Sequence, residues 1–137
     1  MKIRLINFGL LTKFIPFRAH VNDAGADVYS PVTRVLNPGS VAAIPLRFGI
    51  ELPDGMVGFI FPRSSLSAKG ITCELPPIDS GYRGEIHVVM SNVGHDTYTI
   101  KEGDRIGQLV ILPVVTPDFT FETFKERGEG AFGSTGK

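Results

Sequence analysis

The sequence is poor in the features that mark several protein classes. Its 137 residues include one cysteine, Cys73, which excludes an internal disulfide and favours a reducing compartment. Fourteen basic residues balance 14 acidic ones, so no overall field draws the chain to nucleic acid or to an anionic membrane. No apolar run is long enough to cross a bilayer, and the run near the N-terminus is interrupted by Asn7. We therefore expect a cytoplasmic protein, or one of the host cytoplasm if a virus encodes it, that binds neither nucleic acid nor membrane.

Side-chain patterns for metal binding and covalent catalysis are also missing. His20, His87 and His95 have no partner histidine or cysteine at the spacing of a metal-binding helix or loop. No serine has a histidine and an acid in an arrangement that the sequence specifies, so a covalent nucleophile is not indicated. Because basic and acidic residues balance, any polyanion that the chain binds must be met by a local site.

The sequence has an all-β rhythm instead. Sixteen glycines and ten prolines separate short segments of β-branched and aromatic residues. Strands are predicted over 3–6, with Ile3 and Leu5 facing inward, and over 26–29, 41–44, 48–51, 56–61, 71–73, 85–91, 97–100 and 106–112. One short helix is predicted over 64–69, with Ser64 as its N-cap and Gly70 as its terminator. We expect a single all-β domain over residues 1–125, a jelly-roll-like distorted barrel of short strands with one short helix.

The segment 126–137 differs in composition from the rest. Glycines at 128, 130, 133 and 136 disfavour regular structure and predict a flexible C-terminal arm. The arm carries Arg127, Phe132 and two hydroxyl groups, and its glycines let backbone N–H groups approach an anion closely. This composition predicts ligand binding by a mobile segment.

An arginine and two serines mark the start of the predicted helix. The amides of Ser65 and Leu66 would point at an incoming ligand, the helix dipole would favour negative charge, and Arg63 would add a fork of donors. The segment predicts a phosphate site. A capped helix with an exposed arginine is the alternative, and this segment alone leaves both open.

A carboxylate and an aromatic ring lie three residues apart in a turn between two predicted strands. If Asp79 faces a cavity, it can orient and deprotonate a water, and Tyr82 can cover one side of a sugar. A loop aspartate is also a common turn former, so a structural role for Asp79 is the alternative.

Two further places offer polar groups. Asp27 lies where a strand should begin, and it either flanks the strand or holds a metal-bound water near a polyphosphate. Arg105 and Gln108 are three residues apart on another predicted strand. They should point to opposite faces, so only one of them is expected to reach a given site.

Five segments, taken in order, resemble the five motifs of the trimeric dUTPases. They are AGADV at 24–28, PRSSL at 62–66, IDSGYRGE at 78–85, GDRIGQL at 103–109 and the arm from Arg127 to Gly136. The resemblance implies a jelly-roll-like fold and a homotrimer whose active sites each use all three subunits. An extended arm of roughly eleven residues spans about 35 Å at about 3.3 Å per residue, enough to reach a neighbouring subunit.

The resemblance also implies an activity, the hydrolysis of dUTP to dUMP and pyrophosphate with Mg²⁺ bound by the triphosphate. Asp79 looks like the base that orients a water for in-line attack on the α-phosphorus, and Tyr82 like the residue that packs on the deoxyribose. Asp27 would contact the metal through water. The other implied substrate-binding residues are Arg63, Ser64, Ser65, Ile78, Gln108, Arg127, Phe132, Gly133, Ser134 and Thr135. Such an enzyme would limit uracil incorporation into DNA and supply dUMP for dTMP synthesis.

The stretch between Gly70 and Asp79 departs from the family pattern. It is about two residues shorter and contains Pro76 and Pro77. In the family this hairpin reads uracil largely with backbone groups, and each proline lacks an N–H. The donors would then have to come from the amides of Cys73, Glu74, Leu75 and Ile78. Base selectivity is the property that this change affects most.

Two other functions are open at this point. dCTP deaminase shares the fold and the Arg-Ser-Ser and Ile-Asp segments, but it needs a glutamate shortly after the third motif, where this chain has His87 followed by Val-Val-Met. A viral or phage regulator could have kept the fold and lost the activity. Retention of Asp79, Tyr82, Arg127 and Phe132 together argues against a dead site, while a regulatory protein partner is compatible with an active one.

Overall fold

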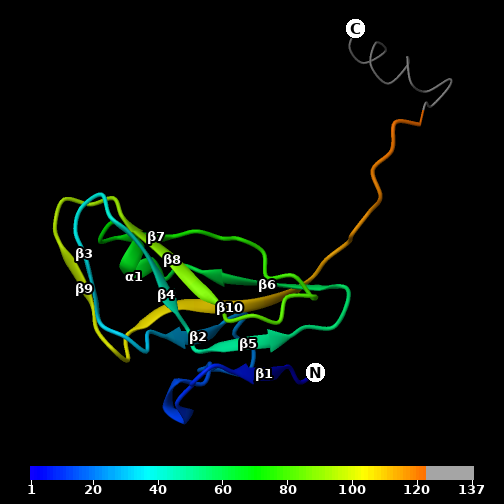
Figure 1. The fold of residues 1–137 in the computed structure, drawn as a ribbon, viewed down its shortest axis with the longest axis horizontal. Coiled ribbons are helices and arrows are strands. Elements are labelled where there is room, and N and C mark those ends of the chain that lie inside the picture. Colours follow the sequence, from blue (N-terminus) through cyan, green and yellow to red (C-terminus); the bar gives the residue numbers. More distant parts are fainter. Residues whose placement is uncertain (123–137) are drawn as a thin grey trace, which may run out of the picture.

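The computed structural model describes residues 1–122 (Figure 1). Its strands are β1 (Arg4–Asn7), β2 (Ala26–Tyr29), β3 (Arg34–Leu36), β4 (Val41–Pro45), β5 (Phe48–Glu51), β6 (Met56–Phe61), β7 (Ile71–Cys73), β8 (His87–Asn92), β9 (Tyr98–Ile100) and β10 (Arg105–Pro113). The described part also contains a 3-10 helix, η1 (Thr12–Phe14), and one α-helix, α1 (Ser64–Ser67). The prediction of an all-β fold with one short helix is confirmed. The predicted arm over 126–137, and with it the boundary at 125, lies outside the described residues.

Four small antiparallel sheets build the structure. The three-stranded sheets have the orders β2-β10-β6 and β4-β8-β7, and the two-stranded sheets pair β1 with β5 and β3 with β9. β10 is the central strand of the first sheet and pairs with β2 on one side and β6 on the other. Segments far apart in the sequence, around residues 27, 61 and 108, therefore meet in one sheet.

The sheets share one hydrophobic core. Its most deeply buried side chains come from three different sheets and include Val28, Ile44 and Ile100. Burial alternates along β8, so Val88 and Met90 face the core while His87 and Val89 face away from it. The outward face of β8 is thereby available to a site.

Most strand predictions are confirmed. β2, β5, β6 and β7 have the predicted bounds, and five other strands differ by one or two residues at one or both ends. β3 (Arg34–Leu36) was missed. It is three residues long and buries only Leu36, so it shows too little alternation to be read as a strand, and it is held by pairing with β9.

The predicted helix is shorter than expected and begins differently. It covers Ser64–Ser67, and its N-cap is Arg63 in an extended conformation with no capping side chain, so the prediction of Ser64 as N-cap was wrong. Gly70 follows with a φ of 82°, which suits glycine and agrees with its predicted role as terminator. No helix in residues 1–122 is long and apolar enough to span a membrane.

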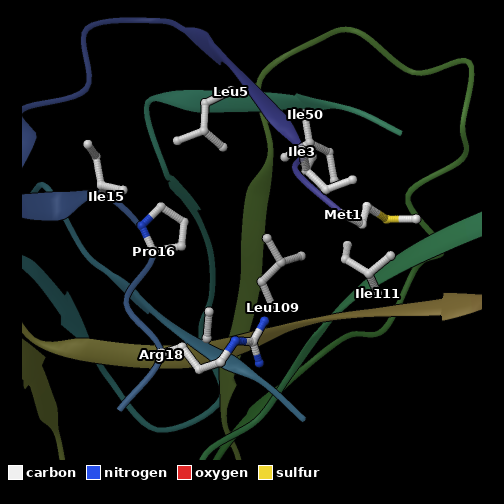
Figure 2. Close-up of a pocket in the computed structure, with 10 residues that line it drawn as sticks. Met1, Ile3, Leu5, Ile15, Pro16, Arg18, Ile50, Leu109 and Ile111 are labelled. Atoms are coloured by element: carbon white, nitrogen blue, oxygen red, sulfur yellow. The ribbon is translucent and has the colours of Figure 1, made fainter. Parts of the chain in front are cut away.

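The N-terminal residues and β1 line an apolar pocket of about 290 Å³ (Figure 2). Ile3 and Leu5 point into it, as predicted, and meet Leu109 and Ile111 of β10. The charged side chain at its edge is Arg18, whose guanidinium donates to the backbone carbonyl of Asp23. The lining is aliphatic, so this pocket offers no carboxylate or hydroxyl for chemistry.

The chain beyond β10 leaves the body of the domain as an extended segment (orange in Figure 1). Phe119 and Phe121 in this segment are fully exposed. Burial of large apolar side chains stabilises a protein, and within the described part of a single chain these two rings are not buried.

Candidate active site

Asp27 and Gln108 lie opposite each other on paired strands. Gln108 of β10 is in register with Asp27 of β2 on one side and with Phe61 of β6 on the other. A Cβ added at Gly25 would lie 2.9 Å from both the Cβ and the Oε1 of Gln108. Glycine at 25 therefore permits the close packing that holds the Gln108 side chain beside Asp27.

A β-bulge brings Arg105 to the same place. The register shifts between Arg105, opposite Tyr29, and Gly107, opposite Val28. The extra residue reverses the alternation of side chains, and the Arg105 guanidinium lies 3.5 Å from the Asp27 carboxylate. The prediction that only one of Arg105 and Gln108 reaches a given site was wrong, because it assumed regular alternation along β10.

The start of α1 joins this group through Arg63. Its guanidinium donates to the backbone carbonyl of Arg105 at 3.2 Å. We call Asp27, Arg63, Arg105 and Gln108 the polar cluster. Of the two amides predicted to face a ligand, that of Leu66 donates instead to the carbonyl of Arg63 at 3.1 Å, so this part of the prediction was wrong.

The serines of α1 remain open to solvent beside the polar cluster. Ser64 and Ser65 are both exposed, directly after Arg63. Arg63 also acts on Tyr98: burial and the Asp104 carboxylate raise the pKa of that phenol, and the positive charge of Arg63 opposes this shift. A hydroxyl pair next to two guanidinium groups is chemistry that suits phosphate oxygens.

The polar cluster fits a magnesium ion that is held mainly by a substrate. No group of three or more His, Cys, Asp or Glu side chains in residues 1–122 is arranged to hold a metal by itself. Mg²⁺ usually keeps several waters and binds through one or two carboxylates plus substrate phosphates. Asp27 supplies one partly buried carboxylate for that purpose, although Arg105 competes for it.

Asp79 and Tyr82 lie together at a second place, around a cavity of about 300 Å³. Asp79 is exposed, but the residue before it is fixed: Ile78 is buried and forms a bridge with Gly58, with N–H to carbonyl distances of 2.8 and 3.0 Å. The Tyr82 amide donates to the Asp79 carbonyl at 3.0 Å and closes a turn. Asp79 therefore lines the cavity on a backbone that hydrogen bonds hold on both sides.

Glycine at 84 allows the Tyr82 ring to fold over its own turn. The Tyr82 hydroxyl donates to the backbone carbonyl of Glu85 at 2.7 Å. A Cβ on Gly84 would lie only 2.6 Å from the Tyr82 Cζ atom, far inside van der Waals contact. Neither Gly25 nor Gly84 is predicted to have a role from the sequence, although glycines inside a motif can signal such close approaches.

The short hairpin offers fewer free amides than predicted. The Glu74 N–H donates to the Val89 carbonyl at 2.9 Å, and the Ile78 N–H to Gly58. Both donors are consumed by the fold, so the prediction that they serve a base was wrong. Burial, followed by the Glu74 charge, raises the pKa of the Cys73 thiol and so disfavours its thiolate form.

The predicted site residues thus fall into two groups within one chain. No hydrogen bond or ion pair between described residues joins the polar cluster to Asp79 or Tyr82. The predicted contacts Arg127, Phe132, Gly133, Ser134 and Thr135 lie outside the described residues.

The family model described as dUTPase matches residues 13–136. The chain belongs to the dUTPase family. Among similar proteins, the deoxyuridine 5'-triphosphate nucleotidohydrolase of Clostridium tetani is 41% identical over 129 residues, which cover 90% of this chain and 89% of that relative. That of Ehrlichia canis is 44% identical over 133 residues, 89% of this chain and 86% of its own length. These dUTPase relatives do not favour the dCTP deaminase alternative.

Solved dUTPases share the fold. A point mutant of the enzyme from phage phi11 of S. aureus, described with a structural Mg(II) ion, superposes with a TM-score of 0.83 at 28% identity and covers 92% of this chain and 99% of its own. A point mutant of the Staphylococcus bacteriophage 80alpha dUTPase with dUpNHpp gives a TM-score of 0.82 at 27% identity, covering 91% and 99%. The work on the 80alpha protein describes phage dUTPases as controlling the transfer of virulence genes.

Proposed function

We propose that the chain hydrolyses dUTP to dUMP and pyrophosphate by in-line attack of a water on the α-phosphorus, with Asp79 as the base. Membership of the dUTPase family supports the reaction. The observation that supports the mechanism is the anchored turn, which holds Asp79 and Tyr82 at one cavity.

In this proposal Asp79 orients the water and accepts its proton as the bond to phosphorus forms. A positioned carboxylate contributes roughly 10²- to 10⁴-fold to such a step. The Tyr82 ring, held over the turn by its hydroxyl, packs on the deoxyribose and leaves no room for a 2′-hydroxyl. Ile78 fixes the turn through its bridge to Gly58.

The polar cluster and the serines of α1 would bind the triphosphate. Arg63 and Gln108 would donate to phosphate oxygens, joined by the hydroxyls of Ser64 and Ser65. Asp27 would hold Mg²⁺ through water. When bound, the ion would neutralise charge on the pyrophosphate leaving group.

We further propose that the active site forms between subunits of a homotrimer. The two groups of site residues are not joined within the described part of one chain, and the exposed Phe119 and Phe121 lie on a segment that leads away from the domain. Arg127 would reach the γ-phosphate, Phe132 would cover the uracil, and the backbone and hydroxyls of 133–135 would close over the phosphates. A head-to-tail contact of this kind closes naturally into a ring.

In the cell the reaction would limit uracil incorporation into DNA and supply dUMP for dTMP synthesis, and we place it in the cytoplasm. Purified protein with Mg²⁺ should release pyrophosphate from dUTP faster than from dCTP, dTTP or UTP. Equal rates with dUTP and dCTP would refute the proposed specificity, and no release from dUTP by an intact oligomer would refute the activity.

A further inference from the structure

Several lining residues of the cavity at Asp79 and Tyr82 have no free backbone donor. Pro76 and Pro77 line it and have no N–H, and the Ile78 N–H is bonded to Gly58. The amide of Ile86, another lining residue, donates to Phe48 at 2.9 Å. Uracil presents two carbonyl oxygens, and each needs a donor if it is to leave water without loss.

The other polar side chains of the cavity are already engaged or are acceptors. The single hydroxyl proton of Tyr82 goes to the Glu85 carbonyl. The Glu85 carboxylate accepts the Arg47 amide at 2.9 Å. Asp79 as a carboxylate only accepts. None of the three supplies a donor to a base carbonyl.

His87 also lines this cavity and differs from these groups. It is the first residue of β8, exposed, and on the same outward face as Val89, which lines the cavity too. Both the protonated and the neutral imidazole carry an N–H, so the ring always has at least one donor. The bond from Glu74 to Val89 holds the hairpin beside this part of β8.

We propose that the His87 imidazole reads the base by donating a hydrogen bond to the 4-carbonyl oxygen of uracil, in place of the donors that Pro76 and Pro77 remove. This role rests on the proposed function, because it places the base in the cavity at Tyr82. An N–H directed at position 4 of the base stabilises the O4 of uracil and not the 4-amino group of cytosine, whereas the 2-carbonyl is common to both bases. His87 is thus a specificity-determining residue for the reaction.

The test compares His87→Ala, His87→Gln and the control His95→Ala, which removes an exposed histidine from the turn after β8. Steady-state hydrolysis of dUTP and dCTP gives kcat and KM for each. A neutral hydrogen bond contributes about 0.5–1.5 kcal/mol, so His87→Ala should raise the KM for dUTP roughly 2- to 12-fold and lower the preference for dUTP over dCTP by a similar factor. The kcat should change less than about twofold, since His87 does not touch the reacting phosphorus.

His87→Gln keeps an N–H donor of similar reach and should stay within about twofold of the wild type. An unchanged KM in His87→Ala, or equal defects in the alanine and glutamine variants, would overturn the role of His87 while the wild-type activity leaves the proposed function standing. A wild type that releases no pyrophosphate from dUTP would overturn both. Thermal unfolding of the variants should match the wild type, because His87 is exposed.

Discussion

Replacing Asp79 by asparagine isolates the chemistry of one carboxylate. Asparagine has almost the same shape, and the anchors of the turn are the backbone groups of Ile78 and Tyr82, which the change leaves intact. The Asp79 carboxylate itself makes no hydrogen bond among the described residues, so its loss should cost little stability. What disappears is the proton acceptor. We expect kcat to fall about 10²- to 10⁴-fold, equivalent to roughly 2.7–5.4 kcal/mol of barrier.

The measurement is pyrophosphate release from saturating dUTP with Mg²⁺. KM should change much less than kcat, because the phosphate and sugar contacts remain. Asp54→Asn is the matched control: Asp54 lies in the turn between β5 and β6 and accepts the Ser80 hydroxyl at 3.4 Å, one residue from Asp79. A near-normal kcat in Asp79→Asn, or an equal loss in Asp54→Asn, would show that another group activates the water.

Three other substitutions test separate parts of the site. Gly84→Ala should displace the Tyr82 ring, because the added Cβ would overlap it. The rate with UTP relative to dUTP should then rise roughly 10-fold. An unchanged ratio would mean that the ring does not exclude the 2′-hydroxyl. Arg105→Gln breaks a half-exposed ion pair with Asp27, which is worth about 0.2–1 kcal/mol. Calorimetry should therefore show the Tm falling by no more than about 4 °C. A drop beyond about 10 °C would contradict this estimate. Removal of residues 127–137 should leave a folded trimer with poor turnover, and unfolding of the truncated protein would show that the segment belongs to the core.

The strands of the fold follow from the sequence where turns and alternation agree. β5 and β6 have their predicted bounds because glycine and proline turns flank segments of apolar and aromatic residues. β3 does not, since its three residues are a strand only by virtue of β9. A local sequence pattern predicts a strand that has its own alternation and turns. It does not predict a strand that exists only through pairing with another strand.

The same distinction applies to the site. The residue types and order of Asp27, Arg63, Asp79 and Gln108 are visible in the sequence. The bulge in β10 that turns Arg105 toward Asp27 is not, because it exists only in the pairing with β2. The consumption of the Glu74 and Ile78 amides likewise depends on partners far along the chain.

Hydrolysis in ¹⁸O-labelled water tests the central claim most directly. The reaction is run as a single turnover, with enzyme in excess over dUTP. Water that attacks the α-phosphorus then leaves its oxygen on dUMP. We predict one labelled oxygen in the dUMP phosphate and none in pyrophosphate, read by mass spectrometry of both products. Label in pyrophosphate with unlabelled dUMP would place the attack on the β-phosphorus and contradict the mechanism.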